Sequence, residues 1–207
     1  MGTLAVDGTV ALTTNGTGNA TVVNDAGFTL VDSSVGGKLS ATATTGDLLF
    51  GGSVIAGMTQ GDGGAYSRIN DETTNTTSGD IDLEATGGSI LNNSLTINAD
   101  SISDGFGGTN KWLSLEGETI TLIAADKIGT TERWLEIDAK TLNASTTSKN
   151  PNSNINIIDK GNLILASLKT EDGSINIASD GPVTQKKVIA GGLESLVNIL
   201  DRETELT

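Results

Sequence analysis

The sequence predicts an all-β protein, a right-handed parallel β-helix (β-solenoid) with coils of about 20–22 residues. Three observations favour this fold class. Apolar and polar residues alternate along most of the chain, and the alternating runs recur with a period near 20 residues. Aromatic residues make up only 3% of the chain. A narrow interior lined by Ile, Leu, Val and Ala has little room for rings, so this composition is typical of a solenoid.

Each alternating run predicts a short strand with one buried face. The apolar positions of the runs, in chain order, are Leu4/Val6, Val10/Leu12, Thr21/Val23, Leu39/Ala41/Ala43, Ile81/Leu83/Ala85, Leu95/Ile97/Ala99, Leu113/Leu115, Ile120/Leu122/Ala124, Leu135/Ile137/Ala139, Leu142/Ala144, Ile155/Ile157, Leu163/Leu165 and Ile175/Ile177. Clusters of Gly, Asn, Asp and Ser separate the runs and predict turns.

The runs also repeat at longer range. The segment Lys111–Glu116 (KWLSLE) resembles Arg133–Asp138 (RWLEID), 22 positions later. Further matches join Ile120/Leu122 to Leu142/Ala144, Leu142 to Leu163, Leu135 to Ile155, and Ile155 to Ile175. Helical repeats are longer, and the Leu and Asn ladder of leucine-rich repeats is missing. At a coil spacing of about 4.8 Å, roughly ten coils would form a rod about 45–50 Å long.

Two loops and a C-terminal change interrupt this pattern. Residues 61–78 lose the alternation and predict an irregular loop, and Asp104–Asn110 predicts a smaller one. The rod is expected to span residues 1–182, with Pro182 ending the last regular coil. Residues 183–207 predict a C-terminal cap or tail with a short helix. The helix is suggested by i, i+3, i+4, i+7 spacing at Leu193, Leu196, Val197 and Leu200.

Composition narrows the function. The net charge of −14 disfavours nucleic-acid binding, which uses basic residues to displace counterions from phosphate. No apolar stretch reaches the ~18 residues of a transmembrane helix, so membrane insertion is not expected. The chain has no Cys and no His, which excludes thiol chemistry, disulfides and imidazole catalysis.

The carboxylates predict no catalytic site. Asp80, Asp82 and Glu84 should point outward, as should Glu136 and Asp138. β-Helical polysaccharide-cleaving enzymes use outward carboxylates, but a solvated acidic face also explains these. No cofactor is predicted. Calcium is a weak option at two groups without a known ligand spacing, Asn70-Asp71-Glu72 and Asp172-Gly173.

The loops are the better candidates for partner binding. Loops on rigid scaffolds often carry function, and Tyr and Arg are enriched among the residues that dominate interface energies. The sequence therefore predicts partner contacts at Tyr66 and Arg68 of the larger loop and at Phe106 of the smaller one.

Three segments resemble coils of filamentous-haemagglutinin-like proteins. They are Gly2–Val10 (GTLAVDGTV), Ser34–Leu48 (SVGGKLSATATTGDL) and Gly79–Ile90 (GDIDLEATGGSI). The resemblance covers most of residues 2–180. It implies an internal or C-terminal stretch of a large bacterial adhesin, exported as an extended β-helical rod and located extracellularly or at the cell surface.

The expected function is thus a structural and adhesive, non-catalytic rod whose partner is a host-surface protein or glycan. Two alternatives stay open. The chain could be a filament subunit that stacks on copies of itself through open β-helix ends, which are sheet edges. It could also be a β-helical polysaccharide-active enzyme.

Overall fold

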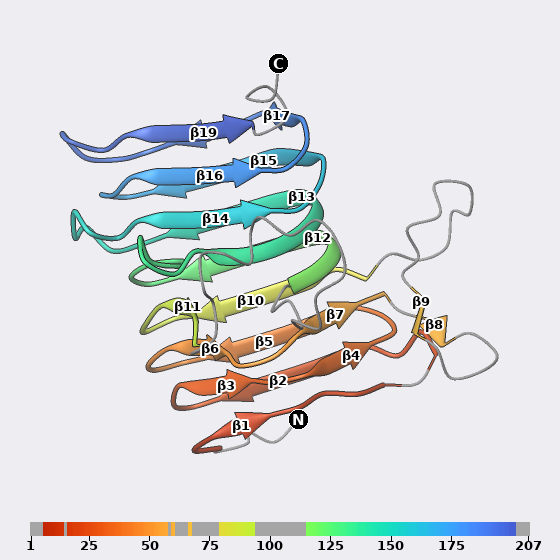
Figure 1. Cartoon of the computed structure of the whole chain (residues 1–207). Coiled ribbons are helices and arrows are strands. Elements are labelled where there is room, and N and C mark those ends of the chain that lie inside the picture. Colours follow the sequence, from red (N-terminus) through yellow and green to blue (C-terminus); the bar gives the residue numbers. More distant parts are fainter. Residues whose placement is uncertain are drawn as a thin grey trace.

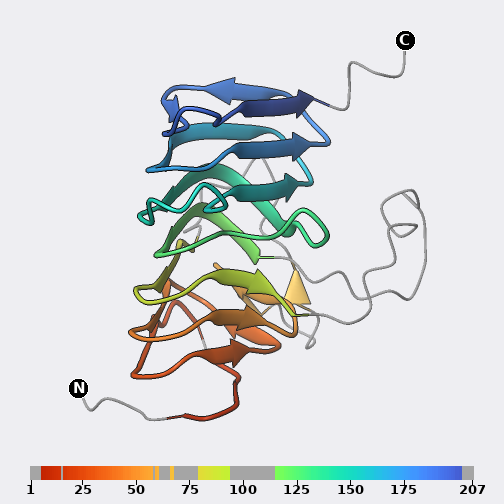
Figure 2. The same cartoon turned by 90° about the vertical axis from the view of Figure 1, so that its left-hand side faces the viewer.

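The structure is a computed structural model that describes residues 6–14, 16–57, 59–60, 66–67, 79–93 and 115–201. Parallel strands stack into a β-solenoid of about seven turns (Figure 1), and the described residues form no helix. The predicted fold class is confirmed. Figure 2 shows the same coils stacked from the red N-terminal end to the blue C-terminal end.

In the N-terminal half of the solenoid, the lower half in Figure 1, three stacks of parallel strands surround the interior. We call these stacks the walls. The first wall contains β2 (Ala20–Asn24), β5 (Leu39–Ala43), β10 (Ile81–Ala85), the later parts of β12 (Leu115–Ala124) and β13 (Leu135–Thr146), and then β15 (Leu163–Thr170), β17 (Val183–Gln185) and β18 (Val188–Ile189). The second wall contains β1 (Thr9–Val10), β3 (Phe28–Leu30), β6 (Leu48–Phe50) and β11 (Ile90–Asn92). The third wall contains β4 (Ser33–Val35), β7 (Val54–Ala56) and the first residues of β12 and β13.

In the upper half, longer strands replace the second and third walls. β14 (Ile155–Asp159) begins on the second wall, where Ile155 bridges Ile128, and continues on the third, where Ile157 pairs with Leu135. The strands β16 (Ile175–Ser179) and β19 (Val197–Asp201) stack on β14 in register. Outside the rod, β8 (Thr59–Gln60) and β9 (Tyr66–Ser67) pair antiparallel.

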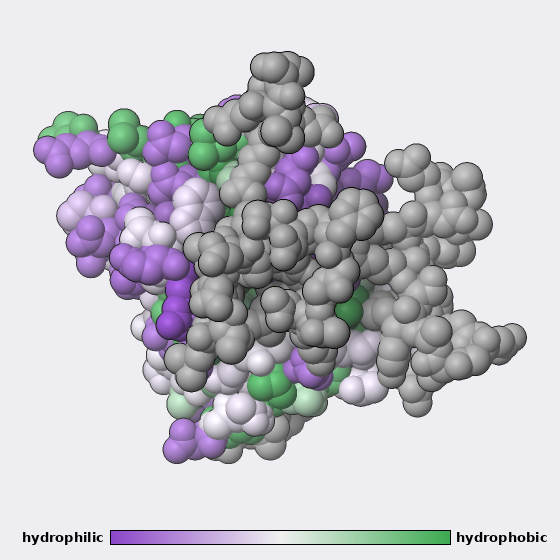
Figure 3. All heavy atoms as spheres, in the orientation of Figure 1, coloured by the Kyte–Doolittle hydropathy of each residue, from purple (hydrophilic) through white to green (hydrophobic). Residues whose placement is uncertain are grey.

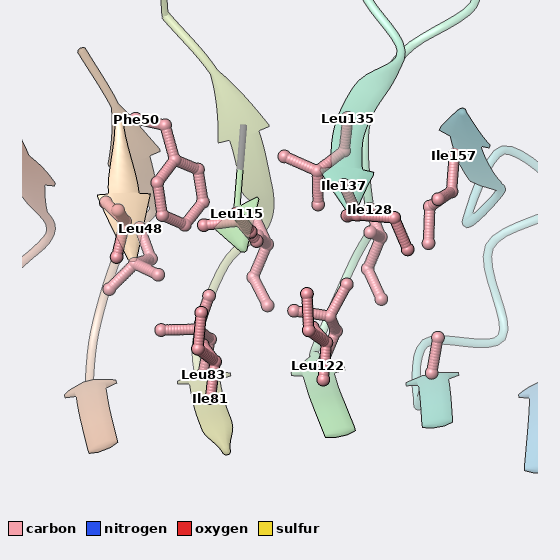
Figure 4. Packing of buried hydrophobic residues seen from close by; sticks show 14 of the residues in the cluster. Leu48, Phe50, Ile81, Leu83, Leu115, Leu122, Ile128, Leu135, Ile137 and Ile157 are labelled. Carbon is pink, nitrogen blue, oxygen red and sulfur yellow. The ribbon is translucent and has the colours of Figure 1, made fainter. Parts of the chain in front are cut away.

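The core consists of columns of inward-facing apolar side chains, one per coil. One column of the first wall is Val22, Ala41, Leu83, Leu122, Ala144, Leu168 and Val188. One column of the second wall is Phe28, Leu48, Ile90, Ile128, Ile155, Ile175 and Val197. Labelled members of the cluster converge between the strands in Figure 4. Full burial of each large side chain contributes about 1.5–3 kcal/mol, so these columns supply most of the driving force for stacking.

The number of coils was predicted wrongly, because two coils carry long insertions. Neighbouring rungs of the first wall are 19 to 24 positions apart, except at two steps. Leu39 pairs with Ile81, 42 positions later, and Ile81 pairs with Ile120, 39 positions later. These steps span residues 58–78 and 94–114, which add chain length without adding a rung. The result is about seven turns instead of ten.

The predicted repeat is confirmed in part. Leu115 pairs with Ile137, as the 22-residue offset predicts, and Ile155 pairs with Ile175. Two other predicted offsets were two residues too short. Leu142 pairs with Leu165 instead of Leu163, and Leu135 pairs with Ile157 instead of Ile155. A register shift follows Leu142. Since strand side chains alternate with a period of two, such an error leaves every residue on its predicted face.

For one strand the predicted face was wrong. β2 buries Val22, while Thr21 and Val23 point outward. The adjacent pair Val22-Val23 fits either face of a strand. Pairing with β5, where Val22 meets Ala41, decides which valine enters the core.

The predicted C-terminal helix is also wrong, and regular pairing continues beyond Pro182. Val197–Asp201 is strand β19, in which Val197 stacks on Ile175 and Ile199 on Ile177. The edge of β16 offers unpaired backbone groups and an apolar column, and both are satisfied by a strand. This tertiary template outweighs the helical spacing of the four apolar residues, as tertiary context often does.

Candidate recognition surface

Both long insertions join the rod at the third wall. The first leaves after Gly57, at the end of β7, and returns at Gly79, whose backbone lies so close to Gly57 that a Cβ on Gly79 would be 2.1 Å from the Gly57 nitrogen. The second leaves after Asn93 and returns at Leu115, which pairs with Val54 of β7. We call residues 58–78 the first excursion and residues 94–114 the second.

The stacking of the rod continues past both excursions. Ile81 sits on Leu39, and the Gly79 carbonyl accepts a hydrogen bond from the Glu118 nitrogen (3.1 Å). On the third wall β12 stacks directly on β7, as Figure 1 shows. The exit of the first excursion and the return of the second therefore belong to adjoining rungs of one wall, at opposite ends of a three-residue strand.

The predicted partner-binding residues belong to these two excursions. Tyr66 lies in β9, where its backbone pairs with Gln60 of β8. Arg68 and Phe106 lie outside the described residues, as do Asn70, Asp71 and Glu72 of the first calcium suggestion. The topology thus brings the attachment points of the two predicted loops to one wall. The spacing of the strands along the sequence did not indicate this.

The outward face of the third wall is uncharged in its lower rungs and acidic in its upper rungs. Its column runs from Ser34 through Ile55 and Glu116 to Asp138. Beside this column Lys140 Nζ lies 3.6 Å from Glu118 Oε1. Ion pairs at this exposure contribute at most about 1 kcal/mol, so they adjust the charge of the wall more than its stability.

Two carboxylates, one in β10 and one immediately before it, connect neighbouring rungs. Asp82 forms a hydrogen-bonded ion pair with Lys38 from the coil below. The hydrogen bond to Asp82 raises the pKa of Lys38. Asp80 Oδ1 accepts a hydrogen bond from the Thr119 nitrogen (3.2 Å) in the coil above. Among the residues that the structure describes, no group of three or more acidic side chains is placed to hold a metal ion.

Glu136 and Asp138 differ in their surroundings, although both belong to β13. Asp138 is partly exposed, whereas Glu136 retains only 8% of its surface. Burial raises the pKa of Glu136, and the positive charge of Lys160 opposes that rise. The prediction of a uniformly solvated acidic face therefore does not hold for Glu136.

Asp159 is a carboxylate that sequence reasoning missed. It occupies the inward column above Ile137 and has no exposed surface. Its Oδ1 accepts a hydrogen bond from the Ala139 nitrogen (3.0 Å), and its Oδ2 accepts one from the Gly161 nitrogen (2.9 Å). Burial raises the pKa of Asp159 to about 7, against the effect of these two hydrogen bonds.

One coil higher, a serine occupies the position of Asp159. Ser179 pairs with Asp159, and its Oγ donates to the Gly161 carbonyl (2.6 Å) and accepts from the Gly181 nitrogen (3.3 Å). Both side chains satisfy backbone groups at the same corner of successive coils. A buried polar group with this set of bonds stabilises a turn, and Asp159 has no surface with which to reach a substrate.

We predict that stability decreases as pH rises from about 4 to about 7, in part through Asp159. Between its unfolded pKa of 3.8 and its folded pKa of about 7, the folded protein keeps a proton that the unfolded chain has released. The contribution of Asp159 is therefore fully present below pH 4 and lost as pH passes 7, a change of at most about 4 kcal/mol.

Urea unfolding at several pH values measures this change. Asp159→Asn should flatten the pH profile between pH 4 and 7, whereas Asp25→Asn, which removes an exposed carboxylate, should leave its slope unchanged. Equal slopes for wild type and Asp159→Asn would show that Asp159 titrates normally in the folded protein.

Comparison with known protein families, curated proteins and solved structures found no match to this chain. Within the described ranges, no helix is long and apolar enough to cross a membrane.

Proposed function

We propose that this chain is a structural and adhesive β-solenoid segment of a bacterial surface or secreted protein, similar to the filamentous-haemagglutinin-like adhesins that its coils resemble. The observation that supports this proposal is the attachment of both excursions to adjoining rungs of the third wall, while the rod stacks past them. The rod thereby places the attachment points of both excursions on one wall.

The composition of the excursions suits recognition. They contain Tyr66, Phe106 and Trp112, half of the six aromatic residues of the chain, together with Arg68. Phe28 and Phe50 are buried in the core. Aromatic and Arg residues dominate the binding energy of most interfaces, so their concentration in the excursions favours a binding role for these segments.

The partner that fits is a host-surface protein or a glycan. Aromatic rings with neighbouring Asn, Asp and Thr offer the stacking and hydrogen bonding that both partners use. The acidic rod would repel nucleic acids and anionic membranes. A polysaccharide-cleaving activity has less support, because Asp80 and Asp82 hold neighbouring rungs and Asp159 is fully buried.

Deletion of the first excursion tests this proposal. Joining Gly57 to Gly79 creates Ala56-Gly57-Gly79-Asp80-Ile81, which has the spacing of Val35-Gly36-Gly37-Lys38-Leu39 in the coil below. Ala56 stacks on Val35 and Ile81 on Leu39, so the shortened rod should fold. We expect it to lose binding to a printed panel of neutral and acidic glycans and immobilised mammalian cell-surface proteins.

Two further variants separate side chains from chain length. Replacing residues 58–78 by a Gly/Ser linker of equal length should abolish binding, and Tyr66→Ala with Arg68→Ala should weaken it at least about tenfold. If the linker variant binds as well as wild type, the first excursion is not the recognition element. Far-UV circular dichroism would verify that each variant keeps the strand content of the rod.

A further inference from the structure

The last coil exposes an apolar surface that the lower coils do not. Seven large hydrophobic side chains are exposed among the described residues, and five of them lie in this coil. They are Ile189, Leu193, Leu196, Val197 and Leu200. Leu193 is fully exposed, and Leu196 and Leu200 expose 62% and 54% of their surface. Figure 3 shows hydrophobic residues gathered over this uppermost coil.

The same coil ends the inward columns without covering them. Val197 continues the column of Ile128, Ile155 and Ile175, all of which are fully buried, yet Val197 is 44% exposed. Within the described part of the chain, β17, β18 and β19 each pair with a strand below and with none above. No strand of the described residues pairs with the backbone groups on their upper edges.

A side-chain ladder also reaches this edge. Asn176 Nδ2 donates to Asn156 Oδ1 (2.9 Å), and Asn198 Nδ2 donates to Asn176 Oδ1 (2.7 Å). Asn156 is buried, whereas Asn198 is exposed. Stacked amides of this kind add a hydrogen bond with each rung. The ladder, like the apolar columns, therefore stops at an edge that resembles the upper faces of the coils below it.

The opposite end of the rod presents a matching coil. β1 pairs with β3 above it and, among the described residues, with no strand below. Val10 is buried, and Val6 and Leu12 pack against the core. The Leu12 nitrogen donates to Ser33 Oγ (3.0 Å) and the Leu12 carbonyl accepts from the Ser34 nitrogen (2.8 Å), so this first coil is held in stacking position.

We propose that the last coil of one molecule receives the first coil of a second copy, so that rods associate head to tail. An open solenoid end presents the edges of all its walls at once, with an apolar interior between them. A single extended peptide would satisfy one wall, whereas a coil of the same perimeter with inward Val and Leu satisfies them together. The first coil of this chain has that perimeter, because Thr9 pairs with Thr29, 20 positions later, and 20 or 22 positions separate the last two rungs of the walls.

The contact joins two different surfaces and does not close on itself, so repetition produces an open filament. This inference does not depend on adhesion, since the excursions attach in the middle of the rod, away from its first and last coils.

Sedimentation velocity over a range of concentrations, with Val197→Lys and Leu12→Lys as end variants, tests the proposal. Lysine on an edge opposes strand pairing. The mass of the wild-type species should at least double from the monomer value of 21.1 kDa as concentration rises, whereas each end variant should remain monomeric. The side-wall variant Ile123→Lys, at a residue with 38% exposure, should associate like wild type.

Mixing the two end variants gives the decisive result. Leu12→Lys keeps an intact last coil and Val197→Lys keeps an intact first coil, so an equal mixture should form a heterodimer and stop there. A wild-type protein that stays monomeric throughout, a mixture that stays monomeric, or equal loss of association in Ile123→Lys would overturn the proposal. Leu196→Lys, at an exposed side chain, replaces Val197→Lys if circular dichroism shows that the latter does not fold.

Discussion

Replacing Leu122 by Asp is expected to unfold the protein, whereas the same replacement at the next residue, Ile123, should leave it folded. Leu122 is fully buried in the first wall between Leu83 and Ala144. An aspartate there removes a buried apolar side chain and places a carboxylate without a partner in the interior. The combined cost is on the order of 5 kcal/mol or more, comparable with the whole stability of a typical domain.

Ile123 is the matched control, because it shares the strand and the chemistry but points outward with 38% of its surface exposed. Its rung neighbour below is Glu84, so Ile123→Asp adds a like-charge contact that should cost no more than about 1 kcal/mol. Urea unfolding followed by far-UV circular dichroism compares the two. Similar losses at both positions would contradict the inward column assigned to the first wall.

The alternation of apolar residues predicted most of the core correctly, because burial depends only on which face a residue occupies. Leu39, Ile81, Ile120 and Ile175 are all buried as expected. β2 is the exception: its two adjacent valines satisfy either face, and the choice comes from pairing with β5. Such a choice belongs to the tertiary structure, so the strand itself carries no signal for it.

Register and coil number depend on information that the pattern lacks. A strand shifted by two residues keeps its buried face, so the pairing of Leu142 with Leu165 could not be distinguished from a pairing with Leu163. The coil count failed because insertions and coils are similar in length. A stretch of 21 residues between Gly57 and Gly79 could equally have formed one more turn of the solenoid.

The C-terminal strand shows how the end of a solenoid misleads a local pattern. Leu193, Leu196, Val197 and Leu200 have helical spacing, but Val197 and Ile199 also alternate and continue the columns of β16. The competing signals have similar local strength. The open edge of β16 exists only after the preceding coils have folded, so the sequence of this segment alone could not decide between them.

At the candidate recognition surface, the sequence pattern predicted the two loops but did not predict that they attach to the same wall. Tyr66 and Phe106 are predicted partner contacts because they are aromatic residues in segments that interrupt the strand pattern. That both excursions flank β7 and β12 follows from the pairing of Leu115 with Val54, a contact between residues 61 positions apart. Asp159 was missed because an acidic residue at the end of a strand is normally exposed, and its burial comes from the corner that it closes.

A corner at which two coils approach closely should not tolerate even an added methyl group, as Gly88→Ala would show. A Cβ at Gly88 would lie 2.3 Å from the carbonyl oxygen of Gly46, a backbone atom of the coil below that cannot move without separating the rungs. We expect a loss of about 2–4 kcal/mol in the free energy of unfolding, from overpacking and from local displacement of two coils.

Gly161→Ala is the matched control, since it lies at another corner where a new Cβ would meet only Asp138 Oδ1, at 4.0 Å. Alanine restricts the unfolded chain more than glycine does, so this variant should be unchanged or more stable by about 0.4–1 kcal/mol. The difference between the two variants separates the effect of coil spacing from the general cost of replacing a turn glycine. If both lose stability equally, close approach of the coils is not what requires glycine at position 88. If Gly88→Ala alone loses stability, the distance between rungs is fixed at the corners as well as by the hydrogen bonds along the walls.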